Sequence, residues 1–188
     1  MTLDELRREA LACTRCALAG GRTQVVFGVG NPHADVMFVG EAPGAEEDRV
    51  GEPFVGRAGQ LLDKLVLEEM GLTRADFFVA NVLKCRPPGN RDPLPGEIES
   101  CRPYLDRQVE LVDPKVVVTL GNFATKLLLA TAEGITKVRG RSYPYRAGVL
   151  VPTFHPAAVL RGGSDPQAKM RADLVRAKLA LETIDAPV

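Results

Sequence analysis

Three polar side chains stand where apolar stretches of the chain end, and their types suit recognition of a small planar molecule. They are Glu41, Asn81 and His155. Taken singly, each has an ordinary structural explanation: a Glu beside glycine often caps a helix, an Asn at a strand end often makes a turn, and a lone His is more often structural than catalytic. Together with the aromatic Phe54, however, a carboxamide and an imidazole favour a pocket for a hydrogen-bonding heterocycle.

The elements that must position these side chains begin with an apolar run at residues 35–39, which predicts a strand. That run stops at residues 40–44, where two glycines and a proline exclude further strand or immediate helix. A loop rich in glycine and carboxylates extends to residue 56, and a helical pattern ending near residue 70 follows. Because ligand sites in open α/β sheets form at the carboxyl ends of strands, this loop is the first place to look for function.

The remaining periodicity alternates strands with helices. Further strands are predicted at residues 76–83, 115–120 and 149–154, and helices at residues 3–12, 95–112, from 122 and from 165. The first helix begins with a capping box at Thr2 and Glu5. Pro103 is expected to break or kink the helix at residues 95–112. This alternation predicts an α/β fold: one three-layer α/β/α domain with a central, mainly parallel sheet of about four strands.

Composition narrows the class of protein. The 188 residues carry 24 basic and 24 acidic side chains, so the chain has no net charge, which argues against a basic nucleic-acid tail but not against a local basic patch. The chain shows no secretory signal and no apolar run of membrane-spanning length. We therefore expect a cytoplasmic protein that does not enter membranes, and nothing in the sequence indicates an oligomer, so we expect a monomer.

Four cysteines predict a metal site. They are Cys13, Cys16, Cys85 and Cys101. In a reducing compartment persistent disulfides are rare, so a Cys-x-x-Cys pair with two further thiols indicates metal binding. Four thiolates suit tetrahedral zinc or a [4Fe–4S] cluster, and the spacing alone does not decide between them.

Four long motifs resemble those of the family 4 uracil-DNA glycosylases, the iron–sulfur members of the uracil-DNA glycosylase superfamily. The motifs are GEAPG at 40–44, GEPFVGRAG at 51–59, NVLKCRPP at 81–88 and HPAAVLR at 155–161. With the four cysteines they cover nearly the whole chain in the right order. The resemblance implies one glycosylase-like domain over residues 1–188, with its N-terminal helix tied in by a metal cluster, and it moves the choice of metal from zinc to [4Fe–4S].

The implied activity is base-excision repair: uracil leaves the DNA stack and its N-glycosidic bond is hydrolysed, leaving an abasic site. By resemblance, Phe54 stacks on the flipped uracil, Asn81 bonds its Watson–Crick edge and His155 donates to its O2, where negative charge develops. Glu41 orients the pocket or helps exclude the thymine methyl. The catalytic set is then Glu41, Asn81 and His155, and the pocket comprises Gly40, Ala42, Gly44, Phe54, Asn81 and His155.

One departure from the best-known members of the superfamily bears on mechanism. They carry an Asp in the first loop that positions or activates water, whereas this chain has Ala42 there. Catalysis then depends on leaving-group stabilisation and strain, unless Glu41 or Glu47 assists the water or the sugar cation. Glu47 equally fits a solvated residue of an acidic run.

The expected partner is uracil-containing DNA, double- or single-stranded. Leu160 is expected to wedge into the minor groove and Arg161 to meet phosphate, with Arg86 and Arg91 on a second DNA-facing loop. The alternative is a non-catalytic iron–sulfur protein that binds DNA or nucleotides. Such a protein would keep the cysteines and the basic loops, but would not need Phe54, Asn81 and His155 together.

Overall fold

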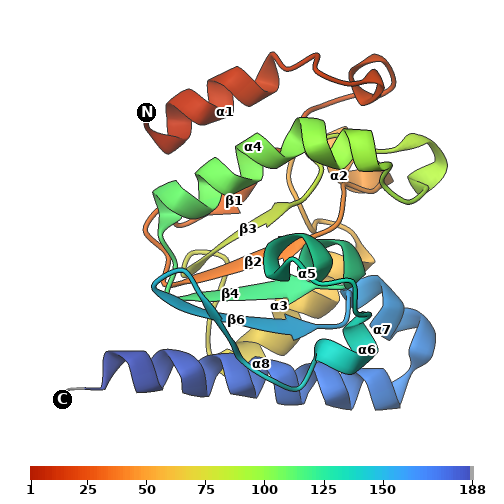
Figure 1. Ribbon diagram of the computed structural model, residues 1–188. Helices are drawn as coiled ribbons and strands as arrows, with labels where there is room; N and C mark the ends of the chain where they lie inside the picture. The colour runs from red at the N-terminus through yellow and green to blue at the C-terminus, as the bar shows by residue number, and fades with distance from the viewer. Residues whose placement is uncertain (187–188) are drawn as a thin grey trace.

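The computed structural model describes residues 1–186, which form a sheet between two layers of helices (Figure 1). The strands are β1 (Val29–Gly30), β2 (Val36–Gly40), β3 (Phe77–Asn81), β4 (Val116–Leu120), β5 (Tyr143–Tyr145) and β6 (Gly148–Thr153). The α-helices are α1 (Leu3–Leu11), α2 (Ala45–Val50), α3 (Arg57–Met70), α4 (Pro95–Val112), α5 (Asn122–Leu129), α6 (Ile135–Val138), α7 (Pro156–Gly162) and α8 (Ser164–Asp185). Two short 3₁₀ turns, η1 (Ala17–Gly20) and η2 (Pro88–Asn90), complete the described chain.

The sheet has the strand order β1-β3-β2-β4-β6-β5. Its four inner strands run parallel, and Gly40 at the end of β2 lies opposite Asn81 at the end of β3. These four are the strands that the sequence predicts, so the α/β class and the parallel core are confirmed. The predicted number of strands was too low, because β1 and β5 add short antiparallel edges of two and three residues.

Each face of the sheet packs on its own helices. One core joins α1, α4 and α5 to side chains such as Met37, Val39 and Phe78, and the other joins α3, α7 and α8 to Phe38 and Phe77. Successive strand residues alternate between the two cores, as the twofold periodicity of a strand requires. The inner strands are therefore apolar on both faces, which is typical of a parallel sheet covered by helices.

In the described part of the chain, five helices, α1, α3, α4, α5 and α8, follow the sequence predictions, and three short ones, α2, α6 and α7, are additions. The capping box of Thr2 and Glu5 is present at α1, and α4 spans its predicted range without interruption at Pro103. Of the additions, α2 lies inside the region expected to be loop. It is bounded by Gly44 at its N-cap and by Gly51, whose φ of 87° ends the helix in the left-handed conformation. None of the helices in residues 1–186 combines the length and apolar character needed to cross a membrane.

Candidate functional site

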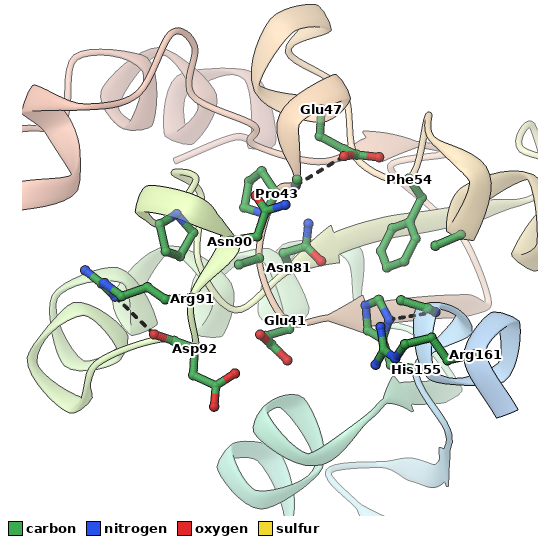
Figure 2. Close-up of a pocket in the computed structure, with 15 residues that line it drawn as sticks. Glu41, Pro43, Glu47, Phe54, Asn81, Asn90, Arg91, Asp92, His155 and Arg161 are labelled. Atoms are coloured by element: carbon green, nitrogen blue, oxygen red, sulfur yellow. Dashed lines mark hydrogen bonds between the residues drawn. The ribbon is translucent and has the colours of Figure 1, made fainter.

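A cavity of about 380 Å³ opens at the carboxyl ends of the parallel strands. Its volume falls in the range of small-molecule sites. Figure 2 shows polar and aromatic side chains converging on it from the β2 and β3 ends, the loop before α4 and the start of α7. Its polar and aromatic wall comprises Glu41, Glu47, Phe54, Asn81, Asn90, Arg91, Asp92, His155 and Arg161.

Asn81 forms the centre of the cavity wall. It ends β3, is only 2% exposed and points its amide into the cavity. Its side-chain Oδ1 is one of the few buried polar side-chain atoms in the described chain with no hydrogen-bond partner. Since buried polar atoms in folded proteins are nearly always paired, this acceptor is available to a ligand that brings a donor.

Phe54 stands beside Asn81 on a strained backbone. Its φ is 54°, an uncommon value for a bulky residue, and its carbonyl accepts a 2.6 Å hydrogen bond from Arg74. A phenylalanine in a loop rich in glycine and carboxylates is expected to be exposed, but Phe54 is only 6% exposed and packs against the sheet side of the cavity. The left-handed backbone turns the side chain inward, a conformation that composition does not reveal.

Gly40 makes room for both groups. A Cβ atom at this position would lie 2.5 Å from Asn81 Oδ1 and 2.5 Å from the Cζ atom of Phe54. Gly59 fits against the backbone of Phe54 in the same way, since its Cβ would lie 1.7 Å from the carbonyl oxygen. The glycines of the two loop motifs thus permit the close approach of the aromatic ring and the amide.

His155 faces Phe54 across the cavity, with the ring centroids 5.7 Å apart. Its Nδ1 accepts a 3.1 Å hydrogen bond from the backbone N–H of Ala157, at the start of α7. The accepting Nδ1 assigns the neutral ring to the tautomer with its proton on Nε2. Burial, followed by the charge of Arg161, lowers the pKa of His155 to about 4, while Glu47 acts in the opposite direction. The imidazole is therefore neutral near pH 7, with Nε2–H as a donor.

Glu47 connects the two loop motifs. One carboxylate oxygen accepts from the backbone N–H of Gly44 at 3.1 Å, and the other accepts from Val55 at 3.0 Å and Gly56 at 2.9 Å. It also lines the cavity. Both oxygens of Glu47 are thus engaged with the backbone that holds Phe54, so it is a clamp within the site rather than one of the exposed residues of an acidic run.

Glu41 lies on the cavity floor, where Figure 2 shows its carboxylate facing Asp92. Burial and the charge of Asp92 raise the pKa of Glu41, and Arg161 lowers it. Ala42 and Gly44 line the same wall, and Ala42 presents only a methyl group to it. The residues directly after β2 therefore place a carboxylate at position 41 and none at position 42.

The predicted DNA-contacting residues fall into two groups. Leu160 on α7 is 44% exposed, and Arg161 beside it lines the cavity. Arg91 also lines the cavity, but its guanidinium is paired with Glu97 at 2.6 Å. Arg86 donates to the side chain of Asn90 at 2.7 Å and does not reach the cavity wall.

The four cysteines gather at a second, smaller cavity beneath α1 and α4. Three segments bring them there: the turn after α1, the segment after β3 and α4 itself. Arg22 donates to the sulfur of Cys85 at 3.4 Å, and the backbone N–H of Lys84 donates to that of Cys101 at 3.2 Å. In residues 1–186 no three His, Cys, Asp or Glu side chains are grouped closely enough to ligate a single metal ion.

Sequence reasoning missed several residues of these two sites. Asp92 and Asn90 line the main cavity from the loop before α4, and Lys84 lies buried between the cavities. The loop before α4 contains Pro87, Pro88 and Pro93, and its approach to the end of β2 depends on tertiary packing that local pattern does not encode. A lysine within an apolar run was the one local signal for Lys84.

Comparisons with known proteins agree on one family. A family model for the uracil DNA glycosylase superfamily matches residues 27–177. A type-4 uracil-DNA glycosylase of Sulfurisphaera tokodaii is 47% identical over 167 residues, covering 85% of this chain and 76% of that protein. The type-4 enzyme of Archaeoglobus fulgidus is 46% identical, covering 85% and 83%. A type-5 uracil-DNA glycosylase of Thermus thermophilus is 30% identical over 141 residues, covering 68% and 62%.

Proposed function

This chain belongs to the uracil DNA glycosylase superfamily, and we propose that it excises uracil from DNA, hydrolysing the N-glycosidic bond and leaving an abasic site. Relatives at 45–48% identity over most of this chain bear the name type-4 uracil-DNA glycosylase. The reaction belongs to base-excision repair, and the substrate is DNA from which the base has been turned out of the stack.

The observation that carries the proposal is the unpaired Oδ1 of Asn81 inside a cavity that also holds Phe54 and His155. A uracil ring has an N3–H donor between two carbonyl acceptors. The Asn81 amide can accept from N3–H through Oδ1 and donate to O4 through its nitrogen, while the Phe54 ring covers the face of the base. A cytosine ring presents an acceptor at N3 and would leave Oδ1 unpaired, which supports selection of uracil.

His155 stabilises the leaving group. As the glycosidic bond breaks, its electron pair moves onto N1 of uracil and the charge spreads to O2. The neutral ring of His155 donates through Nε2–H to that oxygen, with the tautomer fixed by the N–H of Ala157 on Nδ1. Because the pKa of His155 is lowered to about 4, the ring is present as this neutral donor throughout the physiological pH range.

Water completes the reaction at the sugar. The cation left at C1′ takes up a water oxygen, and the proton of that water passes to solvent or to a carboxylate. Two carboxylates between residues 40 and 56, Glu41 and Glu47, line the cavity, whereas Ala42 has no polar group. We assign to Glu41 the role of accepting the proton of the water or stabilising the sugar cation. Glu47 holds the loops, because both of its carboxylate oxygens already accept hydrogen bonds from backbone N–H groups.

The cysteine site suits a [4Fe–4S] cluster. Four sulfurs from three segments line one cavity, with N–H donors on Cys85 and Cys101 that would offset thiolate charge. Cys13, Cys16, Cys85 and Cys101 would ligate the cluster, and its contribution is to join α1 to the segment after β3. Zinc is the less fitting occupant, because it needs the sulfurs to converge on one ion and no three ligand side chains in residues 1–186 are grouped so closely. The metal content of purified protein tests this choice.

The DNA surface is proposed around the cavity mouth. Leu160 is a large apolar side chain exposed next to Arg161, the arrangement expected of a wedge with a phosphate contact. Arg161 is the basic residue of that helix that also faces the cavity. Because Arg91 is paired with Glu97, its role in DNA contact is weaker than that of Arg161.

The test is uracil release from a duplex that carries one uracil, scored as alkali-labile breaks at that position. We expect breaks with the uracil duplex, none with a thymine control, and loss of most activity in Asn81→Ala. Asn31→Ala, at a partly exposed asparagine outside the cavity, is the matched control and should keep full activity. Retention of the oligonucleotide without breaks would instead favour the non-catalytic binding protein.

A further inference from the structure

Lys84 is buried between the cysteine site and the cavity. Lys84 is only 2% exposed, although lysine is among the residue types least often buried. Its ammonium donates to the carbonyl oxygen of Asn81 at 2.6 Å and to Oε1 of Gln108 at 2.5 Å. Gln108 is itself fully buried and donates to the carbonyl of Phe27 at 2.7 Å.

No carboxylate in residues 1–186 forms an ion pair with Lys84. A buried ammonium without an opposite charge is costly, and buried charges are normally paired. The cysteine sulfurs are the candidates for that charge: the backbone N–H of Lys84 donates to the sulfur of Cys101, and Cys85 is the next residue. Cysteine thiolates would thus supply the negative charge that balances the Lys84 ammonium, since no carboxylate in residues 1–186 does.

The same ammonium reaches the recognition residue. The Asn81 carbonyl belongs to the peptide that leaves β3, and the next two N–H groups, of Val82 and Leu83, bond to the carbonyls of Gly40 and Glu41. With Lys84 on the carbonyl side, the backbone around Asn81 is held from both directions. The orientation of the Asn81 amide, whose Oδ1 has no hydrogen-bond partner, depends on that backbone.

We propose that Lys84 is a positioning residue that links the two sites: its charge compensates the thiolates, and its hydrogen bond to the Asn81 carbonyl sets the amide that recognises the base. This inference rests on the proposed function and on thiolate ligation at the cysteine site. It follows that the charge at the cysteine site affects the orientation of the Asn81 amide, through the Lys84 side chain.

Two substitutions separate the charge from the hydrogen bond. Lys84→Met removes both with little change of volume. Gln108→Glu, the matched control, adds one negative charge beside the ammonium and keeps the contact between Lys84 and Asn81. Each variant changes the local charge by one unit in the same direction, and each perturbs the same buried network.

Three readouts are measured on metal-loaded protein: metal content with the absorption spectrum, the reduction potential of the bound cluster, and single-turnover uracil release under saturating enzyme. We expect the potential to become more negative in both variants. Uracil release should fall roughly 10- to 100-fold in Lys84→Met, the effect of losing a charged hydrogen bond, and less than about 3-fold in Gln108→Glu. Affinity for DNA that carries an abasic site should not change in either.

Equal losses of uracil release in the two variants, or an unchanged potential in both, would overturn the inference. In an Asn81→Ala background, Lys84→Met should have no further effect on release, since residues that act through one another are not additive. If Lys84→Met does not accumulate as folded protein, Lys84→Leu, which also has no donor, is measured against Gln108→Glu with the same expectations. Absence of uracil release by the unaltered protein refutes the proposed function instead, so the two failures are distinct.

Discussion

Replacing Gly40 by alanine tests whether Asn81 and Phe54 form the base-recognition site. The added Cβ would lie 2.5 Å from both Asn81 Oδ1 and Phe54 Cζ, whereas ordinary contact begins near 3.4 Å. The amide and the ring must therefore each retreat by about 0.9 Å (3.4 minus 2.5). Both contacts are with the far ends of side chains, so the backbone of β2 can keep its pairing with β3.

The two effects of this substitution differ in size. Overpacking of this kind costs about 1–3 kcal/mol of stability. Displacement of reacting groups by about 1 Å can lower a rate by about 100-fold. We therefore expect Gly40→Ala to stay folded at 25 °C and to release uracil about 100-fold more slowly, with little change in affinity for abasic DNA.

The assay is single-turnover uracil release at saturating enzyme, together with thermal unfolding of the same preparations. Gly96→Ala is the control, because a Cβ at Gly96 meets nothing within 4 Å and the residue lies in the first turn of α4. It should keep both activity and stability. A folded Gly40→Ala protein that released uracil at the unaltered rate would refute the assignment of Asn81 and Phe54 to the base.

Three further predictions concern charge, metal and DNA. Because burial lowers the pKa of His155 to about 4, the folded protein keeps this ring neutral well below pH 6.5. The unfolded chain takes up the proton near pH 6.5, so stability should fall progressively as the pH drops from about 6.5 to about 4. NMR titration of His33→Ala, which leaves one histidine, checks this, and a midpoint near 6.5 would contradict it. Cys85→Ser should lose metal and lower Tm by more than about 5 °C, because metal binding stabilises the folded state. Full metal content by elemental analysis would show that Cys85 is not a ligand. Leu160→Ala should slow uracil release from duplex DNA about 10-fold more than from single strands, because a wedge is needed only where bases are stacked in a duplex. Leu179→Ala, at another exposed leucine, is the control and should change neither rate. Equal losses on both substrates would argue against a wedge.

The parts of the fold that sequence predicted are those with a strong local signal. The inner strands are apolar runs ended by glycine or polar residues, and the box at Thr2 and Glu5 marks the start of α1. The edge strands escaped prediction because β1 has two residues and β5 is three residues around Pro144, too short for any periodicity. The helix α2 was hidden by its flanking glycines, although acidic residues in its first turn favour a helix start.

Within the site, the sequence predicted which side chains come together at one cavity, but it did not predict their environment. Asn81 and His155 lie on the cavity because parallel strand ends meet at one edge, which topology alone requires. The inward turn of Phe54 and the burial of Lys84 arise from contacts between segments distant in the chain, such as Arg74 with the Phe54 carbonyl and Gln108 with the ammonium. No local pattern encodes such contacts.

The absence of an aspartate at Ala42 is consistent with how the rest of the cavity is built. Three features of the structure are energetically costly: the positive φ of Phe54, the unpaired Oδ1 of Asn81 and the buried imidazole of His155. In the proposed mode of binding, all three face the base rather than the sugar. Strain and unsatisfied groups persist where binding of the substrate repays them. We therefore expect the barrier to be lowered mainly by stabilisation of the departing uracil anion, with water activation contributing less. Replacing Glu41 by Gln should then lower the rate of uracil release less than Asn81→Ala or His155→Ala does.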